Sequence, residues 1–152
     1  MIGRLDELNQ LERFYNSSKF EFLTMYGRRR IGKTTILREF AGRHKALFFS
    51  AQEKNDSLNL LDFSKMVQTF FEGSFISSFQ NWEAAFEYIT GKISDKKLVL
   101  IIDEFPFLAE PNPSIKSILQ HTIDHVWKGK NIFLILCGSS VSFMLNDVMG
   151  YK

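Results

Sequence analysis

Four short stretches of the chain are rich in apolar residues, and the segments between them place apolar residues three or four positions apart. The stretches cover residues 20–26, 46–50, 98–102 and 132–137. Their lengths predict strands. The third and fourth are unbroken apolar runs, which is typical of strands buried on both faces of a parallel sheet.

The segments between the strands predict helices, because their apolar residues fall on one face at the helical period. Polar residues that can accept from free helix N–H groups mark the starts, and glycines mark the ends. The predicted start signals are Asp6, Asn81 and Ser114, and the predicted ends are Gly42, Gly73, Gly91 and Gly129. From Ser57 onward the spacing of the apolar residues becomes helical.

Two helical stripes predict much of the core. Aromatic residues recurring at the helical period favour core packing over a base-stacking surface. The first stripe is Phe63, Met66, Val67, Phe70 and Phe71, and the second is Ile115, Leu119, Ile123 and Val126. A final helical turn is expected through residues 141–148.

Strands that alternate with helices predict an α/β fold with three layers and a mainly parallel sheet. Ligands of such sheets bind beyond the carboxyl ends of the strands. The turns that follow residues 20–26, 98–102 and 132–137 should therefore meet at one site.

The turn after the first strand satisfies the phosphate-loop pattern G-x-x-x-x-G-K-[ST]. In such loops backbone N–H groups line an anionic pocket, the lysine reaches the β and γ phosphates, and the hydroxyl ligates Mg²⁺. The next helix points its positive end at the same phosphates. The residues expected to contact the nucleotide here are Gly27, Arg28, Arg29, Arg30, Ile31, Gly32, Lys33, Thr34 and Thr35.

Two further turns supply chemistry. Asp103 follows an apolar strand, where P-loop NTPases carry a carboxylate that holds the magnesium bound by Thr34. The next residue, Glu104, is placed to polarise a water for attack on the γ phosphate. Ser139 or Ser140 offers a hydroxyl to that phosphate or to the water, although capping of the last helix explains either serine as well.

Composition narrows the class of protein. With 152 residues and 45% hydrophobic content, the chain forms one domain with a substantial core. No apolar run approaches the roughly 20 residues that cross a bilayer, and no signal segment opens the chain, so a cytoplasmic protein without membrane contact is expected. Cys137, the single cysteine, lies within an apolar strand and predicts a buried structural thiol.

Two other site types are disfavoured. A net charge of +2 does not by itself imply nucleic-acid binding, and a polyphosphate ligand explains the arginines around the loop more simply. His121 and His125 are spaced as zinc ligands on a helix can be, but the glutamate of H-E-x-x-H is absent between them.

Four motifs in order resemble a prokaryotic ATPase family found mainly in archaea, within the AAA+ and STAND branch of P-loop ATPases. They lie at residues 2–8, 27–34, 100–108 and 136–140 and span essentially the whole chain. The resemblance implies that Ile2, Gly3 and Arg4 lie near the adenine of ATP or ADP. It also implies that Glu104 activates water and that Ser139 is a sensor residue.

The sequence ends before the fifth strand and helical lid that follow in such ATPases, so residues 1–152 are expected to be the N-terminal ATPase core. In that branch the strand order is 5-1-4-3-2, which leaves residues 20–26 at an edge open to a second copy of the chain. Self-association through this edge is therefore expected. Slow hydrolysis is expected because a lid or neighbour usually supplies the positive group that stabilises the transferring phosphoryl group. A nucleic-acid partner is expected through downstream regions.

Three other classes remain open at this point. A small-molecule kinase uses the same loop with a second substrate pocket, and a nucleotide-binding regulatory module hydrolyses little. A nucleic-acid-binding module would rely on the early arginines and bind with steep salt dependence.

Overall fold

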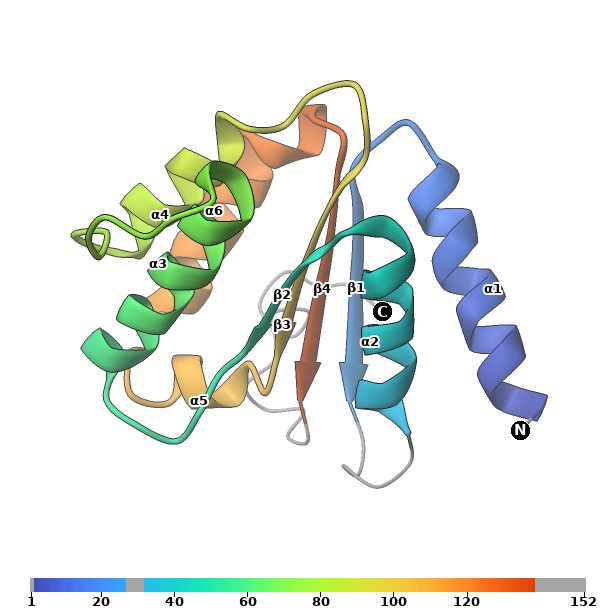
Figure 1. Cartoon of the computed structure of the whole chain (residues 1–152), viewed down its shortest axis with the longest axis horizontal. Coiled ribbons are helices and arrows are strands. Elements are labelled where there is room, and N and C mark those ends of the chain that lie inside the picture. The colour runs from blue at the N-terminus through green and yellow to red at the C-terminus, as the bar shows by residue number, and fades with distance from the viewer. Residues whose placement is uncertain (1, 27–31, 139–152) are drawn as a thin grey trace.

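A computed structural model describes residues 2–26 and 32–138, with side chains from Asp6 onward except Tyr26 (Figure 1). The strands are β1 (Glu21–Tyr26), β2 (Leu47–Ser50), β3 (Leu98–Asp103) and β4 (Ile132–Gly138). The helices are α1 (Ile2–Asn16), α2 (Lys33–His44), α3 (Asp56–Glu72), α4 (Trp82–Thr90), α5 (Pro106–Ala109), α6 (Ser114–His125) and the 3₁₀ turn η2 (Trp127–Gly129). Within these residues no helix is long and apolar enough to cross a membrane.

The four strands form one parallel sheet in the order β1-β4-β3-β2. Leu136 of β4 pairs with Thr24 on one side and Ile102 on the other, which fixes the register at the carboxyl ends. The α/β fold class is confirmed, and the order agrees with the expected 1-4-3-2. Among the described residues β1 pairs only with β4, so its other edge is open there.

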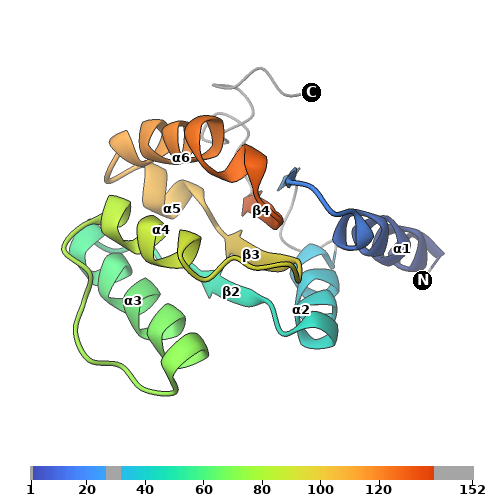
Figure 2. The same ribbon diagram turned by 90° about the horizontal axis from the view of Figure 1, so that it is seen from above.

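Helices cover both faces of the sheet. Helices α1 and α2 lie on one side, and α3, α4 and α6 lie on the other (Figures 1 and 2). Alternate residues of β3 divide between them: Ile101 packs with α1 and α2, whereas Leu100 and Ile102 pack with the larger layer. Both central strands are buried on both faces, as their unbroken apolar runs predict.

The start of two helices is fixed by asparagine side chains. Asn55 Oδ1 accepts from Leu58 N at 2.9 Å, and Asn81 Oδ1 accepts from Ala84 N at 2.8 Å. The cap at Asn81 is confirmed, whereas α3 begins one residue before the predicted Ser57.

Four further helix boundaries differ from those predicted. Helix α1 begins at Ile2 rather than Asp6, and α2 continues through Gly42 to a left-handed Lys45. A glycine inside a helix costs only about 1 kcal/mol, so the apolar stripe of α2 outweighs it. Ser114 does not cap α6, and that helix ends at His125 before a separate 3₁₀ turn.

Two predicted core residues are exposed. Phe70 is 40% and Val126 is 38% exposed, because each lies near the end of its helix, beyond the layer that covers the stripe. Trp127, just past α6, is fully buried instead, and its indole Nε1 donates to Thr90 Oγ1 at 2.8 Å. The predicted stripe residue Phe63 is fully buried among aromatic neighbours.

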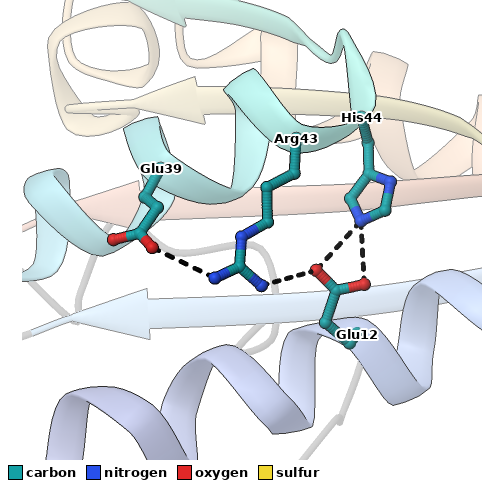
Figure 3. Close-up of polar contacts among 4 residues, drawn as sticks. All are labelled: Glu12, Glu39, Arg43 and His44. Atoms are coloured by element: carbon teal, nitrogen blue, oxygen red, sulfur yellow. Dashed lines mark hydrogen bonds and ion pairs between the residues drawn. The ribbon is translucent and has the colours of Figure 1, made fainter.

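A polar cluster joins α1 to α2 (Figure 3). Glu12 of α1 accepts from His44 Nε2, at 2.8 and 3.0 Å to its two oxygens, and from Arg43 at 3.3 Å. Arg43 also bonds Glu39 at 3.1 Å, and the His44 ring stacks on Tyr15 with 3.7 Å between centroids. These contacts attach α1 to the helix that follows the phosphate loop.

Candidate functional site

The glycine-rich turn enters α2 through a left-handed residue. Gly32 has φ 80° and ψ 9°, a conformation that strains any residue with a Cβ, and its carbonyl accepts from Ile36 N at 3.0 Å. The second glycine of the pattern is thus required by the backbone. The residues Gly27, Arg28, Arg29, Arg30 and Ile31 lie outside the described residues.

Lys33 is buried, with 6% of its surface exposed. Its Nζ donates to the carbonyl of Gly138 at 3.2 Å, across the ends of α2 and β4. The lysine of the phosphate-loop pattern is therefore a buried cation and not an exposed loop charge. The apolar stem packs inside the protein while the ammonium group lies at the carboxyl edge of the sheet, where the ligands of parallel sheets bind.

Thr34 and Asp103 meet although 69 positions separate them. Thr34 Oγ1 donates to Asp103 Oδ2 at 3.1 Å. Asp103 is the last residue of β3 and is 4% exposed. The turns that follow β1 and β3 therefore meet, as the sequence predicts, with a hydroxyl and a carboxylate in contact.

Glu104 has a left-handed backbone, with φ 57°. Its N–H donates to Asp103 Oδ1 at 2.9 Å, and the next residue, Phe105, is fully buried and donates its N–H to the Cys137 carbonyl at 2.8 Å. Strained conformations persist where surrounding contacts fix them, and they gather at functional sites. The turn that bears Glu104 is held by the carboxyl end of β4.

The thiol of Cys137 is fully buried beside the site. Burial raises its pKa to about 12, and the nearby Asp103 carboxylate adds to the rise. The group is therefore a neutral thiol at physiological pH, and the predicted structural role is confirmed.

The remaining expected site residues are placed as follows. Thr35 is exposed on the first turn of α2. Ile2, Gly3 and Arg4 form the first turn of α1, but their side chains lie outside the described residues, as do Ser139 and Ser140. The rings of His121 and His125 are 4.3 Å apart, and no metal-binding group of three ligands occurs among the described residues.

Two backbone carbonyls of β4 were not found from the sequence. The Gly138 carbonyl holds Lys33 and the Cys137 carbonyl holds Phe105. A carbonyl carries no residue-type signal, so only the pairing of β4 between β1 and β3 reveals it.

Archaeal proteins resemble this chain in sequence. The sequence profile of an ATPase domain predominantly from Archaea matches residues 1–152. An uncharacterized protein of Methanocaldococcus jannaschii is 33% identical over 99% of this chain and 32% of its own length. An uncharacterized ATP-binding protein of the same organism is 41% identical over 29% of this chain and 75% of its own length.

Solved structures share the fold. Cdc6p of Pyrobaculum aerophilum aligns with a TM-score of 0.61 and 19% identity over 92% of this chain and 40% of that chain. A chain of the Drosophila ORC complex with AT-rich DNA and Cdc6 aligns with a TM-score of 0.59 and 17% identity over 93% of this chain and 47% of its own. The present chain thus spans about a third of the first Methanocaldococcus jannaschii relative and less than half of the two solved chains.

Proposed function

Because the chain belongs to the family of P-loop ATPase domains found predominantly in Archaea, we propose that it binds ATP with magnesium and hydrolyses it to ADP at this site. The observation that carries the proposal is the 3.1 Å contact between Thr34 Oγ1 and Asp103 Oδ2. It joins the end of the phosphate loop to the end of an interior strand.

The pair suits magnesium. Mg²⁺ prefers hard oxygen ligands in octahedral geometry at about 2.1 Å, so two neighbouring ligands stand about 3 Å apart. The separation of Thr34 Oγ1 and Asp103 Oδ2 matches that spacing. Magnesium held there would neutralise charge on the β and γ phosphate oxygens.

Lys33 is the proposed phosphate contact. In this structure its ammonium donates to a neutral carbonyl, that of Gly138. A phosphate oxygen is a charged acceptor and forms a hydrogen bond roughly twice as strong, so the ammonium is expected to turn from the carbonyl to the nucleotide. The start of α2 adds its positive end to the same place. The loop residues 27–31 and Thr35 are proposed to complete the phosphate contacts.

Glu104 is the proposed general base. Its carboxylate would accept a proton from water as the water attacks the γ phosphate. The carbonyl of Asp103 accepts from Ala51 N at 3.0 Å, so the turn is held from β2 as well as from β4. Ser139 is proposed to bond the γ phosphate, and Ile2, Gly3 and Arg4 are proposed to contact the adenine.

A double-mutant cycle tests the magnesium pair. Thr34→Val and Asp103→Asn should each weaken magnesium-dependent ATP binding, and the double variant should lose less than the sum, because both act on one ion. Thr69→Val and Asp62→Asn are matched controls on α3, away from the site. The assignment would be overturned if the losses of the two single variants added fully in the double variant. It would also be overturned if the affinity for ATP were the same with and without magnesium.

Product analysis separates the classes of activity. Release of inorganic phosphate supports the ATPase proposal, and transfer to a nucleoside would replace it by a small-molecule kinase. Tight binding without phosphate release would indicate a nucleotide-binding regulatory module.

The open edge of β1 offers a surface for self-association. We propose that a second copy pairs with the open edge of β1, which light scattering would test, since an unpaired strand edge is a template for pairing. A nucleic-acid partner, a cytoplasmic location and the role of residues 1–152 as an ATPase core remain predictions from the sequence.

A further inference from the structure

The edge of the sheet opposite the candidate site carries a row of lysines. Each parallel strand is preceded, two residues before its start, by a lysine. In the spatial order of the strands these are Lys19, Lys130, Lys96 and Lys45. With strands about 4.8 Å apart, the four backbone positions span about 14 Å. We name these four residues the lysine row.

Two grooves lie along this edge and meet at Ser94. One, of about 540 Å³, is lined by Lys19 and Lys130 of the row together with Lys128 and Asp95. The other, of about 230 Å³, is lined by Lys45 and Lys96 with Lys92 and Lys97. In Figure 1 the strands begin in the upper part of the picture, and this is the edge along which the grooves lie. Figure 2 shows the molecule from that side.

Positive charge is concentrated on this edge. Side chains of seven lysines and one carboxylate line the two grooves, whereas the whole chain has a net charge of only +2. The remaining residues of the chain are therefore net negative in sum. A charge that is separated in this way creates a local potential that attracts polyanions.

The other three lysines that line the grooves have partners of their own. Lys92 pairs with Glu72 at 2.9 Å and Lys128 with Asp124 at 3.4 Å. Lys97 is 7% exposed, burial lowers its pKa, and its ammonium bonds the Ser17 hydroxyl at 3.0 Å and the Lys19 carbonyl.

The four lysines of the row are exposed and form no ion pair with a described carboxylate. The end of α2 favours a cation at Lys45, but this helix accounts for that residue alone.

An exposed aromatic ring lies in the same place. Phe70 lines the groove with Lys45 and Lys96, and its 40% exposure is unusual for a residue on the apolar stripe of α3. The neighbouring Phe71 carries Lys92 above its ring at 5.7 Å. A positive groove that holds an exposed aromatic ring is the arrangement by which proteins bind single-stranded nucleic acid, since every base has a face that stacks.

We propose that this edge binds single-stranded nucleic acid, with the lysine row on the phosphates and Phe70 stacking on a base. The surface lies at the opposite end of the strands from the nucleotide site, so the proposal does not rest on ATP hydrolysis. A duplex buries its base faces and would leave Phe70 without a partner, which is why the single strand is the fitting occupant.

Salt dependence gives a quantitative test. Anisotropy of a labelled oligothymidylate of about 15 nucleotides, titrated with the full chain, should give a slope of log K against log salt of about −3, at about 0.7 per phosphate for four contacts. Lys96→Gln with Lys130→Gln should reduce the slope to about −1.4 and weaken binding about 25-fold near 0.1 M salt. The control variant Lys65→Gln with Lys116→Gln removes the same amount of charge, from α3 and α6. It should leave the salt slope and the affinity unchanged.

Stacking and partner class are tested in the same assay. Phe70→Leu should weaken binding about fivefold or more, and Phe75→Leu, which changes an aromatic residue outside both grooves, should not. Oligouridylate that binds as tightly as oligothymidylate supports the proposal, which concerns single-stranded nucleic acid of either kind.

Three outcomes would overturn it. They are unchanged affinity in the Lys96 and Lys130 variant, a duplex bound as tightly as the single strand with no effect of Phe70→Leu, and displacement by polyglutamate as effective as by unlabelled oligonucleotide. The last would identify an acidic protein as the partner instead.

Discussion

Replacing Glu104 by glycine and by alanine separates its backbone strain from its chemistry. Both changes remove the carboxylate and every contact that its side chain makes. Only glycine relaxes the left-handed backbone, whose φ is 57°. The difference between the two variants therefore reports the strain alone.

The size of that difference follows from the backbone. A left-handed conformation costs a residue with a Cβ about 1–2 kcal/mol, and glycine loses about 0.4–1 kcal/mol through the greater entropy of its unfolded chain. Glu104→Gly should therefore be more stable than Glu104→Ala by roughly 0.5–1 kcal/mol. The buried Phe105 and its bond to the Cys137 carbonyl keep the turn in place in both.

Urea denaturation measures the difference in stability, provided that the free energy of unfolding falls with urea at the same slope in both variants. Calorimetry measures ATP binding, and phosphate release measures hydrolysis. Both variants should bind ATP and hydrolyse it more slowly than the unchanged protein, by about 10²-fold or more, the contribution typical of a general base. A glycine variant less stable than the alanine variant would refute the strain. Hydrolysis at the original rate in either would refute the role of Glu104.

Three further predictions concern the fold. Phe63→Ala should destabilise the protein by about 3–5 kcal/mol in urea denaturation, whereas Phe70→Ala on the same helix should change stability by less than about 0.5 kcal/mol, so equal losses would contradict the burial pattern. The thiol of Cys137 has a pKa raised to about 12 in the folded protein from 9.0, so its contribution to stability is complete below pH 9 and is lost between pH 9 and 12. Cys137→Ala should therefore lose less stability than the unchanged protein between pH 8 and 10.5. In the unchanged protein the thiol should react with iodoacetamide at pH 8 only when urea unfolds the chain. Rapid labelling of the native protein would contradict the burial of the thiol. Glu12→Ala should cost about 1 kcal/mol because it removes the bonds to His44, and the exposed Arg43→Ala less than about 0.5 kcal/mol, as thermal denaturation would show.

The sequence predicted the strands and the meeting of the two motifs because those features have direct signals. Unbroken apolar runs occur where both faces of a strand are buried, as in β3 and β4. Parallel strands place their carboxyl ends together, which is why Thr34 and Asp103 were expected in one site and are found 3.1 Å apart.

The errors arise where several elements act together. The periodicity of α3 predicts that Phe70 faces inward, but it does not show where the covering layer ends. The fully buried Trp127 follows a helix end, where the period no longer applies. Likewise the burial of Lys33 depends on a carbonyl of β4, and a single-residue pattern carries no record of that neighbour.

Calorimetry with ATP and magnesium tests the central claim most directly, using the unchanged chain and Lys33→Met, which keeps an apolar stem in the buried position. The site described here predicts binding of one ATP per chain, weakened roughly tenfold to a hundredfold in the variant through loss of a charged hydrogen bond, with unchanged circular dichroism. Equal affinity in a folded Lys33→Met variant, or no binding by the unchanged chain, would contradict the assignment of this site to ATP.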